Sequence, residues 1–428
     1  MSSVPITADR ARRTLLLLTF TRWFPVGLTI GVTTLIPLER GMSLSQIGVI
    51  FAMQGFVVLG LELPTGGLAD ALGRRPILLT SALFAIVASF LFIAADTFAG
   101  FVVALLLQGV FRALDSGPLE AWYVDTTHAD DPTVAVEGGL SQAGTALGLS
   151  IAAGALTSGA LVAWHPVTAV SAISFPYWCA IPLFLVHLIA TGWLVQEPPS
   201  TLDQSGWRGA LTSVQHAPAV VAGGLRALTT SRVLMALVLV EVFWSIGMIA
   251  FETLMPIRLA EVVGGETQAG ALMGPVSAAA WGLFALGATL ASRASRRIGV
   301  AWTALLARIL NGIFIIVMGL TTGPLGLITA FLLTYTLHGS AGPMHSTLLH
   351  RQATTGNRTT ILSMNSMVAG GTFSLGLLAL GPLAQVTSPA TAIIAAGTFS
   401  IIGALLYLPA RSQERAAGFD TENRPHGE

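Results

Sequence analysis

Lysine is absent from this sequence of 428 residues, so all 21 basic side chains are arginines. A phosphate-binding loop and a Schiff base both need lysine, and both are excluded. The single cysteine, Cys179, excludes an internal disulfide bond and a metal site built on several cysteines. The formal net charge is zero, which leaves no basic excess of the kind that binds nucleic acid.

Charged residues of both signs are scarce, and apolar residues are abundant. Charged side chains make up 10% of the chain, hydrophobic residues make up 53%, and the mean hydropathy is +0.75. A soluble domain carries about 25% charged residues, so this chain lacks the charge to cover a solvated surface. A disordered chain would be less hydrophobic. The composition predicts a polytopic membrane protein.

Long apolar stretches predict an all-α membrane protein with twelve transmembrane helices. A helix that crosses the hydrocarbon core needs about 20 apolar residues, and both charge-free runs and runs with one or two buried charges reach that length. The first stretch is too long for a signal-peptide core, so we expect it to be part of the mature protein. The predicted helices are residues 14–38, 44–68, 76–95, 98–123, 138–163, 170–195, 232–257, 269–292, 299–321, 324–347, 359–383 and 389–410.

The distribution of arginine predicts the orientation of these helices. With both termini in the cytoplasm, sixteen arginines lie on the inner side and only Arg40 and Arg258 lie outside. The loop 125–137 is an exception, because it is predicted to be cytoplasmic yet is acidic and has no arginine. Arginine-only usage is typical of a GC-rich bacterium, so we expect the plasma membrane to be the location.

The chain divides into two halves that resemble each other. We predict a six-helix bundle over residues 1–196, a cytoplasmic linker over 197–231, a second six-helix bundle over 232–410 and a tail over 411–428. The linker either carries an amphipathic helix on the membrane surface or has no fixed structure. Residues 116–120 match residues 341–345 at an offset of 225, as expected for duplicated units with a substrate site between them.

The segment after the second predicted helix reads Gly66-Gly67-Leu68-Ala69-Asp70-Ala71-Leu72-Gly73-Arg74-Arg75. It resembles the signature of the major facilitator superfamily between helices 2 and 3, except at Ala71, where a basic residue is usual. The resemblance implies two pseudo-symmetric six-helix bundles and transport by alternating access. It also implies a conformational switch in which Asp70 contacts the start of helix 11 near Asn357 and Arg358. The residues that carry this switch are Gly66, Asp70, Gly73, Arg74 and Arg75.

Two further patterns are similar to bacterial drug or metabolite:proton antiporters of this superfamily. Arg112, Asp115 and Gly117 resemble an Arg-x-x-Gln-Gly pattern, with aspartate in place of glutamine and the glycine one place later. The fifth helix carries Gly144-x-x-x-Gly148, but Leu149 stands where exporters usually have proline.

Ionisable residues inside the predicted helices are candidates for proton coupling, because burying a charge in a membrane is costly. Glu241 is the leading candidate, since it lies about 14 Å into its helix with no basic residue within one turn. Asp115 is the second, and it forms either a static ion pair with Arg112 or a carrier site when that pair opens. Glu120 and Glu62 are the remaining candidates.

The resemblance further implies that helices 1, 4, 7 and 10 line a central cavity. It places six candidate substrate residues there: Arg22, Trp23, Arg112, Trp244, His338 and His345. Each has an alternative role, because Arg22 can snorkel to the interface and the histidines can be packing residues. Trp23 and Trp244 occupy equivalent positions and could stack on an aromatic substrate.

The leading functional hypothesis is proton-coupled export of small apolar or amphipathic compounds, because the cavity helices carry few amides. The alternative is an uptake symporter for a polar nutrient or an organic anion. A membrane sensor is disfavoured, and no nucleophile–base pair or metal-ligand spacing favours an enzyme. We expect no cofactor, no metal and no nucleic-acid partner. The expected partners are the lipid bilayer, protons and a small-molecule substrate, and the expected state is a monomer.

Overall fold

The computed structural model describes residues 6–196, 231–353 and 358–422, together with residues 222, 223, 226, 228 and 229. Contacts divide the chain into two compact units. Unit 1 consists of Met1–Ala217 and Gly264–Ala278, and unit 2 consists of Pro218–Val263 and Ala279–Glu428. The described residues contain helices and no strand, which confirms the all-α fold class.

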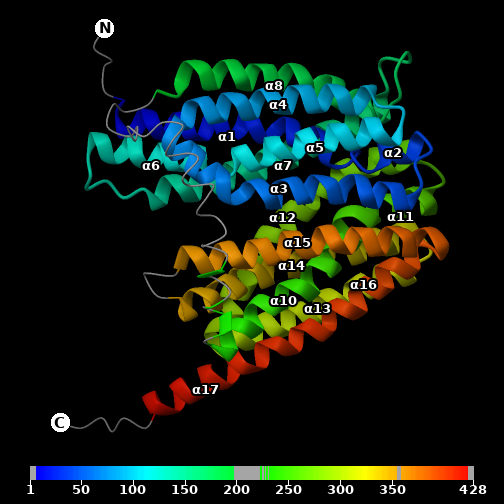
Figure 1. Ribbon diagram of the computed structural model, residues 1–428. Helices are drawn as coiled ribbons and strands as arrows, with labels where there is room; N and C mark the ends of the chain where they lie inside the picture. The colour runs from blue at the N-terminus through cyan, green and yellow to red at the C-terminus, as the bar shows by residue number, and fades with distance from the viewer. Residues whose placement is uncertain are drawn as a thin grey trace. The chain divides into compact units, whose positions relative to one another are not determined.

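Unit 1 contains the helices of the first half of the chain, which lie alongside one another (Figure 1). Helix α1 packs on α7 and α8, α3 packs on α5, and α4 packs on both α5 and α8. The helices are α1 (Ala8–Ile30), α2 (Leu35–Glu39), α3 (Leu44–Leu72), α4 (Arg74–Ala94), α5 (Phe98–Asp115), α6 (Pro118–Asp130), α7 (Glu137–Trp164) and α8 (Phe175–Leu194).

Unit 2 is built on the same plan. Helix α10 packs on α15 and α16, and α13 packs on α14 and α16. Helix α12 (Glu266–Ile298) begins within the segment that belongs to unit 1. The other helices are α10 (Arg232–Ile249), the π-helix η1 (Ala250–Leu254), α11 (Met255–Val263), α13 (Val300–Leu320), α14 (Pro324–Gln352), α15 (Arg358–Val386), α16 (Pro389–Ala404), the 3₁₀ turn η2 (Leu405–Tyr407) and α17 (Leu408–Glu422).

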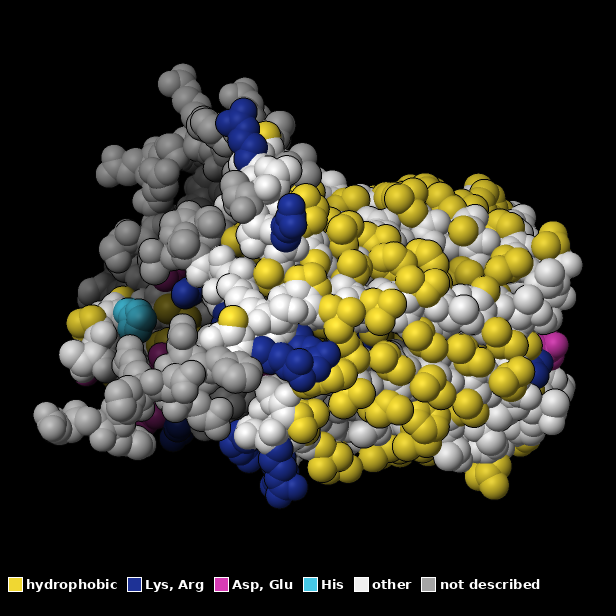
Figure 2. Space-filling view, turned by 90° about the horizontal axis from the view of Figure 1, so that it is seen from below, with side chains coloured by type: hydrophobic (Ala, Val, Ile, Leu, Met, Phe, Trp, Pro, Cys, Tyr) yellow, Lys and Arg dark blue, Asp and Glu magenta, His cyan; other side chains and the backbone are white. Residues whose placement is uncertain are grey.

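Eleven helical stretches within the described residues are long and apolar enough to cross a membrane. The twelfth predicted span corresponds to α14, which has 29 residues but does not reach the same apolarity. Figure 2 shows apolar side chains over a broad band of one face, with arginines gathered toward one end of that band. This arrangement suits a belt of lipid-facing residues with a charged rim.

The predicted helices are present, but several are interrupted or begin elsewhere. The predicted helix 98–123 is divided into α5 and α6, because Gly117 adopts a left-handed conformation (φ 96°) and Pro118 begins the next helix. The predicted helix 170–195 begins later, at Phe175, with Pro176 in its first turn. The linker helix predicted within 197–231 lies almost entirely outside the described residues.

Equivalent contacts join equivalent helices in the two units. In unit 1 the Ser81 hydroxyl of α4 donates to the Phe111 carbonyl of α5 at 3.1 Å. In unit 2 the Asn311 amide of α13 donates to the Thr334 carbonyl of α14 at 2.8 Å. All four residues come from helix pairs related by the repeat. These hydrogen bonds between helices of an apolar bundle help to set the relative orientation of the helices that carry the candidate site.

Candidate functional sites in the two units

Unit 1 holds a buried ion pair between two helices. The Arg22 guanidinium of α1 contacts the Asp115 carboxylate at the end of α5, and only 8% and 10% of the two side chains are exposed. The guanidinium carbon also lies 4.0 Å from the centre of the Trp23 ring and 4.8 Å from that of Phe111. Each charge therefore lies in a largely apolar setting, where the opposite charge of its partner compensates it.

This pairing differs from the partner that sequence spacing suggested for Asp115. The i,i+3 spacing favoured Arg112, but the Arg112 side chain is exposed, and the partner is Arg22 from a helix distant in the sequence. The other two candidate carboxylates of unit 1 are less enclosed. Glu120 is exposed in the first turn of α6, and Glu62 is half-buried in α3.

Unit 2 holds a buried network around Glu241, which lies on α10 and is 6% exposed. The Nε2 atom of His345 on α14 lies 3.0 Å from Glu241 Oε1 and 3.1 Å from Asn365 Oδ1 on α15. Its Nδ1 atom lies 2.8 Å from the Tyr407 hydroxyl in η2. We call Glu241, His345, Asn365 and Tyr407 the Glu241 network. It joins α10, α14, α15 and η2.

The chemistry of this network accommodates two protonation states. In either state His345 Nε2–H donates to the Glu241 carboxylate. A neutral His345 accepts at Nδ1 from the Tyr407 hydroxyl, whereas a charged His345 donates to the hydroxyl oxygen, since a phenol does both. The ring therefore gains or loses a proton without losing either contact. Because the Tyr407 hydroxyl can donate to or accept from Nδ1, this geometry suits proton transfer.

Arg308 on α13 completes the buried charge of unit 2. Its guanidinium carbon lies 3.6 Å from the centre of the Trp244 ring, and its charge acts on Glu241. Arg308 was not among the candidate site residues that the sequence indicated. The sequence also did not indicate Asn365 and Tyr407 as partners of His345. A charge inside a span was the visible signal for Arg308, but no signal marked Tyr407.

Six aromatic rings of unit 2 form an aromatic cluster. His338 lies at its centre, with ring centroids of Trp244 at 4.8 Å, Phe284 at 5.1 Å and Phe251 at 5.4 Å. The His338 Nδ1 atom is buried and has no hydrogen-bond partner among the described residues. Beside it, the Tyr335 hydroxyl donates to Glu252 at 2.5 Å. The six residues are Trp244, Phe251, Trp281, Phe284, Tyr335 and His338.

The loop that carries the family motif is built around Gly73. Helix α3 ends at Leu72, and α4 begins at Arg74 because Gly73 adopts φ 94° and ψ 153°. Arg74 pairs with Asp125 at 2.9 Å. The side chains of Asp70 and Gly66, and Asn357 as a whole, lie outside the described residues.

The other motif residue, Arg75, donates from Nη2 to the Gly192 carbonyl at 2.5 Å. Together, Arg74 and Arg75 connect the start of α4 to α6 and α8.

Gly299 is the equivalent of Gly73 in unit 2, with φ 85° and ψ 160° before α13. There the Glu414 carboxylate accepts from the backbone N–H of Val300, at 3.0 Å. Both halves thus anchor the start of an equivalent helix.

The acidic loop of unit 1 has a structural reason for its charge. Asp125 binds Arg74, and Asp130 accepts from the Ala8 backbone N–H at 2.9 Å. Asp131 accepts from the Thr133 backbone N–H at 2.8 Å and from its hydroxyl at 2.7 Å. Hydrogen bonds from the side chain and backbone of Thr133 lower the pKa of Asp131. These contacts give the acidic side chains of this segment a structural role.

Metal-ligating residues do not gather in the part of the chain that the structure describes. Within residues 6–196, 231–353 and 358–422, no group of three or more His, Cys, Asp or Glu side chains could hold a metal ion.

Comparisons with known proteins agree with this architecture. A family model described as the Major Facilitator Superfamily matches residues 15–297. No curated protein matches the sequence. Among solved structures, a mutant of the nucleoside transporter NupG gives a TM-score of 0.76 at 11% identity, covering 93% of this chain and 99% of that one. A POT family transporter in complex with 5-aminolevulinic acid gives 0.68 at 15% identity, covering 93% and 95%.

Tetrameric PepTSo2 gives a TM-score of 0.71 at 13% identity, covering 96% of this chain and 99% of the other. At such low identity these likenesses describe the fold. They extend over almost the whole of each chain, whereas the family model covers the first two thirds of this one.

Proposed function

The chain belongs to the Major Facilitator Superfamily of membrane transporters, and from that premise we propose that it is a proton-coupled carrier that exports small amphipathic or aromatic compounds. Glu241 and His345 carry the proton in this proposal, and Trp244 and His338 contact the substrate. The two units change their access to the two sides of the membrane in turn.

The Glu241 network is the observation that carries proton coupling. A coupling group must be ionisable, shielded from bulk water and linked to a partner that tolerates either protonation state. Glu241 and His345 are 6% and 4% exposed and lie 3.0 Å apart. The Tyr407 hydroxyl can hydrogen-bond to Nδ1 of His345 whether the ring is neutral or charged. In unit 1 the carboxylate of Asp115 is held by Arg22, a permanent cation, so protonation there would break the pair.

The aromatic cluster supports the substrate class. Rings attract flat apolar molecules and organic cations over their faces. The His338 Nδ1 atom provides a single polar group among them without a partner in the described chain. A sugar site would instead need several hydrogen-bonding amides. We therefore propose an aromatic or amphipathic substrate with one hydrogen-bonding group.

A second candidate is proton-driven uptake of an organic anion. Buried Nη1 atoms of Arg22 and Arg308 have no hydrogen-bond partner within the described residues, so either could take up a carboxylate. The similar structures described as nucleoside and POT family transporters are compatible with this candidate. Direction of flux separates the two candidates.

The orientation also remains our proposal: both termini and the 197–231 linker face the cytoplasm of a bacterial cell, and the carrier works as a monomer. Membrane-impermeant thiol labelling of intact cells tests the orientation on a Cys179→Ala background. Ser213→Cys in the linker should stay unlabelled from outside. Thr322→Cys, between α13 and α14, should label strongly and serves as the matched control. Labelling of Ser213→Cys from outside would mean that the chain has the opposite orientation in the membrane.

Transport in proteoliposomes tests proton coupling. Purified protein is reconstituted with a pH-sensitive dye inside, and planar aromatic cations and aromatic carboxylates are screened under an imposed pH gradient. Glu241→Gln should abolish gradient-driven movement yet retain exchange of substrate for substrate. Glu252→Gln is the control, because its carboxylate binds Tyr335 outside the network. A wild-type ratio of protons to substrate in Glu241→Gln would place the carrier elsewhere.

A further inference from the structure

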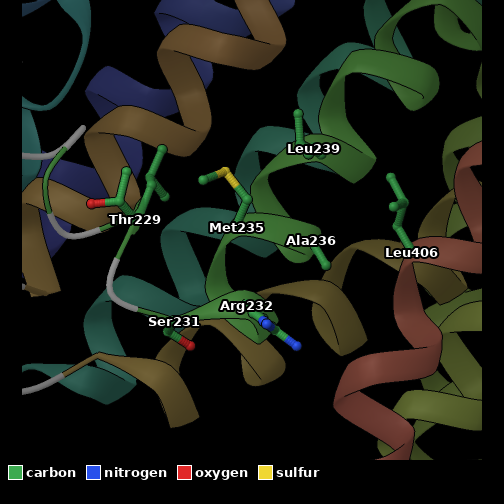
Figure 3. A pocket seen from close by; sticks show the side chains of 8 residues that line it. Thr229, Ser231, Arg232, Met235, Ala236, Leu239 and Leu406 are labelled. Atoms are coloured by element: carbon green, nitrogen blue, oxygen red, sulfur yellow. The ribbon is translucent and has the colours of Figure 1, made fainter.

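A groove lies at the arginine-rich end of unit 2, beside the first two turns of α10. Its volume is about 210 Å³, which is below the range of sites for drug-sized molecules. Figure 3 shows side chains from α10 on one wall and Leu406, from the 3₁₀ turn η2, on the other. We call it the α10 groove, and it is lined by Leu228, Thr229, Ser231, Arg232, Met235, Ala236, Leu239 and Leu406.

The groove changes from polar to apolar along the helix axis. Arg232, Met235, Ala236 and Leu239 follow one another at the i, i+3, i+4 and i+7 spacing of a single helix face. At 1.5 Å per residue, Leu239 lies about 10 Å further along α10 than Arg232. A charged group therefore marks one end of the groove, and only apolar side chains line the other. A phospholipid has the same division between headgroup and acyl chain.

The charge at the polar end is positive and uncompensated. Arg232 is exposed and forms no ion pair within the described residues, and the lining contains no acidic side chain. The nearby hydroxyls already have local contacts, since Ser231 accepts from the Leu234 backbone N–H at 3.2 Å and Thr229 donates to the Arg226 carbonyl at 2.7 Å. Arg232 is thus the group in the lining that is available to an anion.

We propose that the α10 groove binds an anionic phospholipid of the surrounding membrane. Arg232 holds the headgroup phosphate, and one acyl chain lies between Met235 and Leu239 of α10 and Leu406 of η2. Basic pockets between transmembrane helices near a membrane surface recognise anionic headgroups in this way. The site lies outside the Glu241 network and the aromatic cluster, so it stands independently of the proposed transport mechanism.

Native mass spectrometry of the full-length protein tests this site, with phosphatidylglycerol and phosphatidylcholine of equal chain length added to the detergent-purified carrier. The wild type should retain phosphatidylglycerol in preference to phosphatidylcholine. Arg232→Gln should reduce retention of phosphatidylglycerol about fivefold, to the level of phosphatidylcholine. Ala236→Leu, which fills the groove without changing charge, should reduce retention of both lipids. Arg297→Gln is the control, because Arg297 is exposed but does not line the groove.

Four results would overturn the proposal. The first is equal retention of the two lipids by the wild type. The second is unchanged retention in Arg232→Gln. The third is competition by soluble glycerol phosphate as effective as that by the lipid, and the fourth is unchanged retention in Ala236→Leu. Either of the last two would mean that only a phosphate binds. Thermal unfolding of each variant confirms that the change is local.

Discussion

The two units bury charge in opposite ways, although they are built from the same helix plan. In unit 1 the first helix supplies a cation, Arg22, and its partner Asp115 comes from α5. In unit 2 the corresponding helix α10 supplies an anion, Glu241, and its partner is a histidine. An arginine stacks on a tryptophan in each, at 4.0 Å from Trp23 and 3.6 Å from Trp244. The stack is common to both units, and the titratable network belongs to unit 2.

This difference suggests that the buried charges have different roles in the two units: stability in unit 1 and proton coupling in unit 2. In unit 1 the Arg22 cation compensates the charge of the Asp115 carboxylate, and the pair joins two helices. In unit 2 the contacts of His345 are compatible with its neutral and its charged form, because the Tyr407 hydroxyl can donate to or accept from Nδ1. We therefore expect substitutions in unit 1 to affect mainly stability and substitutions in unit 2 to affect mainly coupling. The following predictions test that contrast in order of decreasing effect.

Breaking the pair in unit 1 should have the largest effect. Asp115→Asn leaves the Arg22 cation buried with no carboxylate on α5, and such a change costs about 3–5 kcal/mol of stability. Arg22→Met together with Asp115→Leu removes both charges and should be markedly more stable than the single variant. Thermal unfolding and yield of the purified protein measure the effect. A single variant as stable as the wild type would show that the pair is not structural.

Exchanging equivalent residues of the two repeats should separate coupling from structure. His345→Gln should reduce proton-driven accumulation about tenfold or more, equivalent to about 1.4 kcal/mol, because the amide cannot carry the proton. Glu120→Gln, at the equivalent position of unit 1, should stay close to wild type, since Glu120 is exposed. Proton flux in proteoliposomes measures both. If Glu120→Gln uncouples transport and His345→Gln does not, the roles of the two units are reversed.

The glycines that precede α4 and α13 should show that the backbone is alike in both units. Gly299→Ala forces a side chain into a backbone region that is nearly exclusive to glycine (φ 85°, ψ 160°), at a cost of about 1–3 kcal/mol. Gly73→Ala should cost a similar amount for the same reason. Gly342→Ala, within α14 and next to open space, is the control and should not destabilise. Equal thermal stability of all three variants would remove the argument from backbone strain.

The motif loop should affect rate rather than stability. Asp70→Asn should leave expression normal and slow transport about fivefold or more, if its charge favours one of the two end states. Asp125→Asn, which removes the observed partner of Arg74, tests whether the same loop needs that contact. Initial rates in proteoliposomes measure both changes. A wild-type transport rate in Asp70→Asn would mean that the loop sets only the orientation of the helices and does not act as a conformational switch.

The sequence by itself determined the membrane class, the helical spans and the superfamily, because these follow from apolar length and from a contiguous motif. It also singled out Glu241, His345, Arg22 and Asp115, since a charge within an apolar span is visible in one dimension. Their partners were not visible. Asp115 meets Arg22 across 93 residues of sequence, and Glu241 meets His345 across 104. The packing of helices distant in the chain determined both pairs, and for Asp115 it gave Arg22 rather than the i,i+3 neighbour Arg112. The physical reason is that a buried charge is stabilised by whichever counter-charge the folded bundle places beside it.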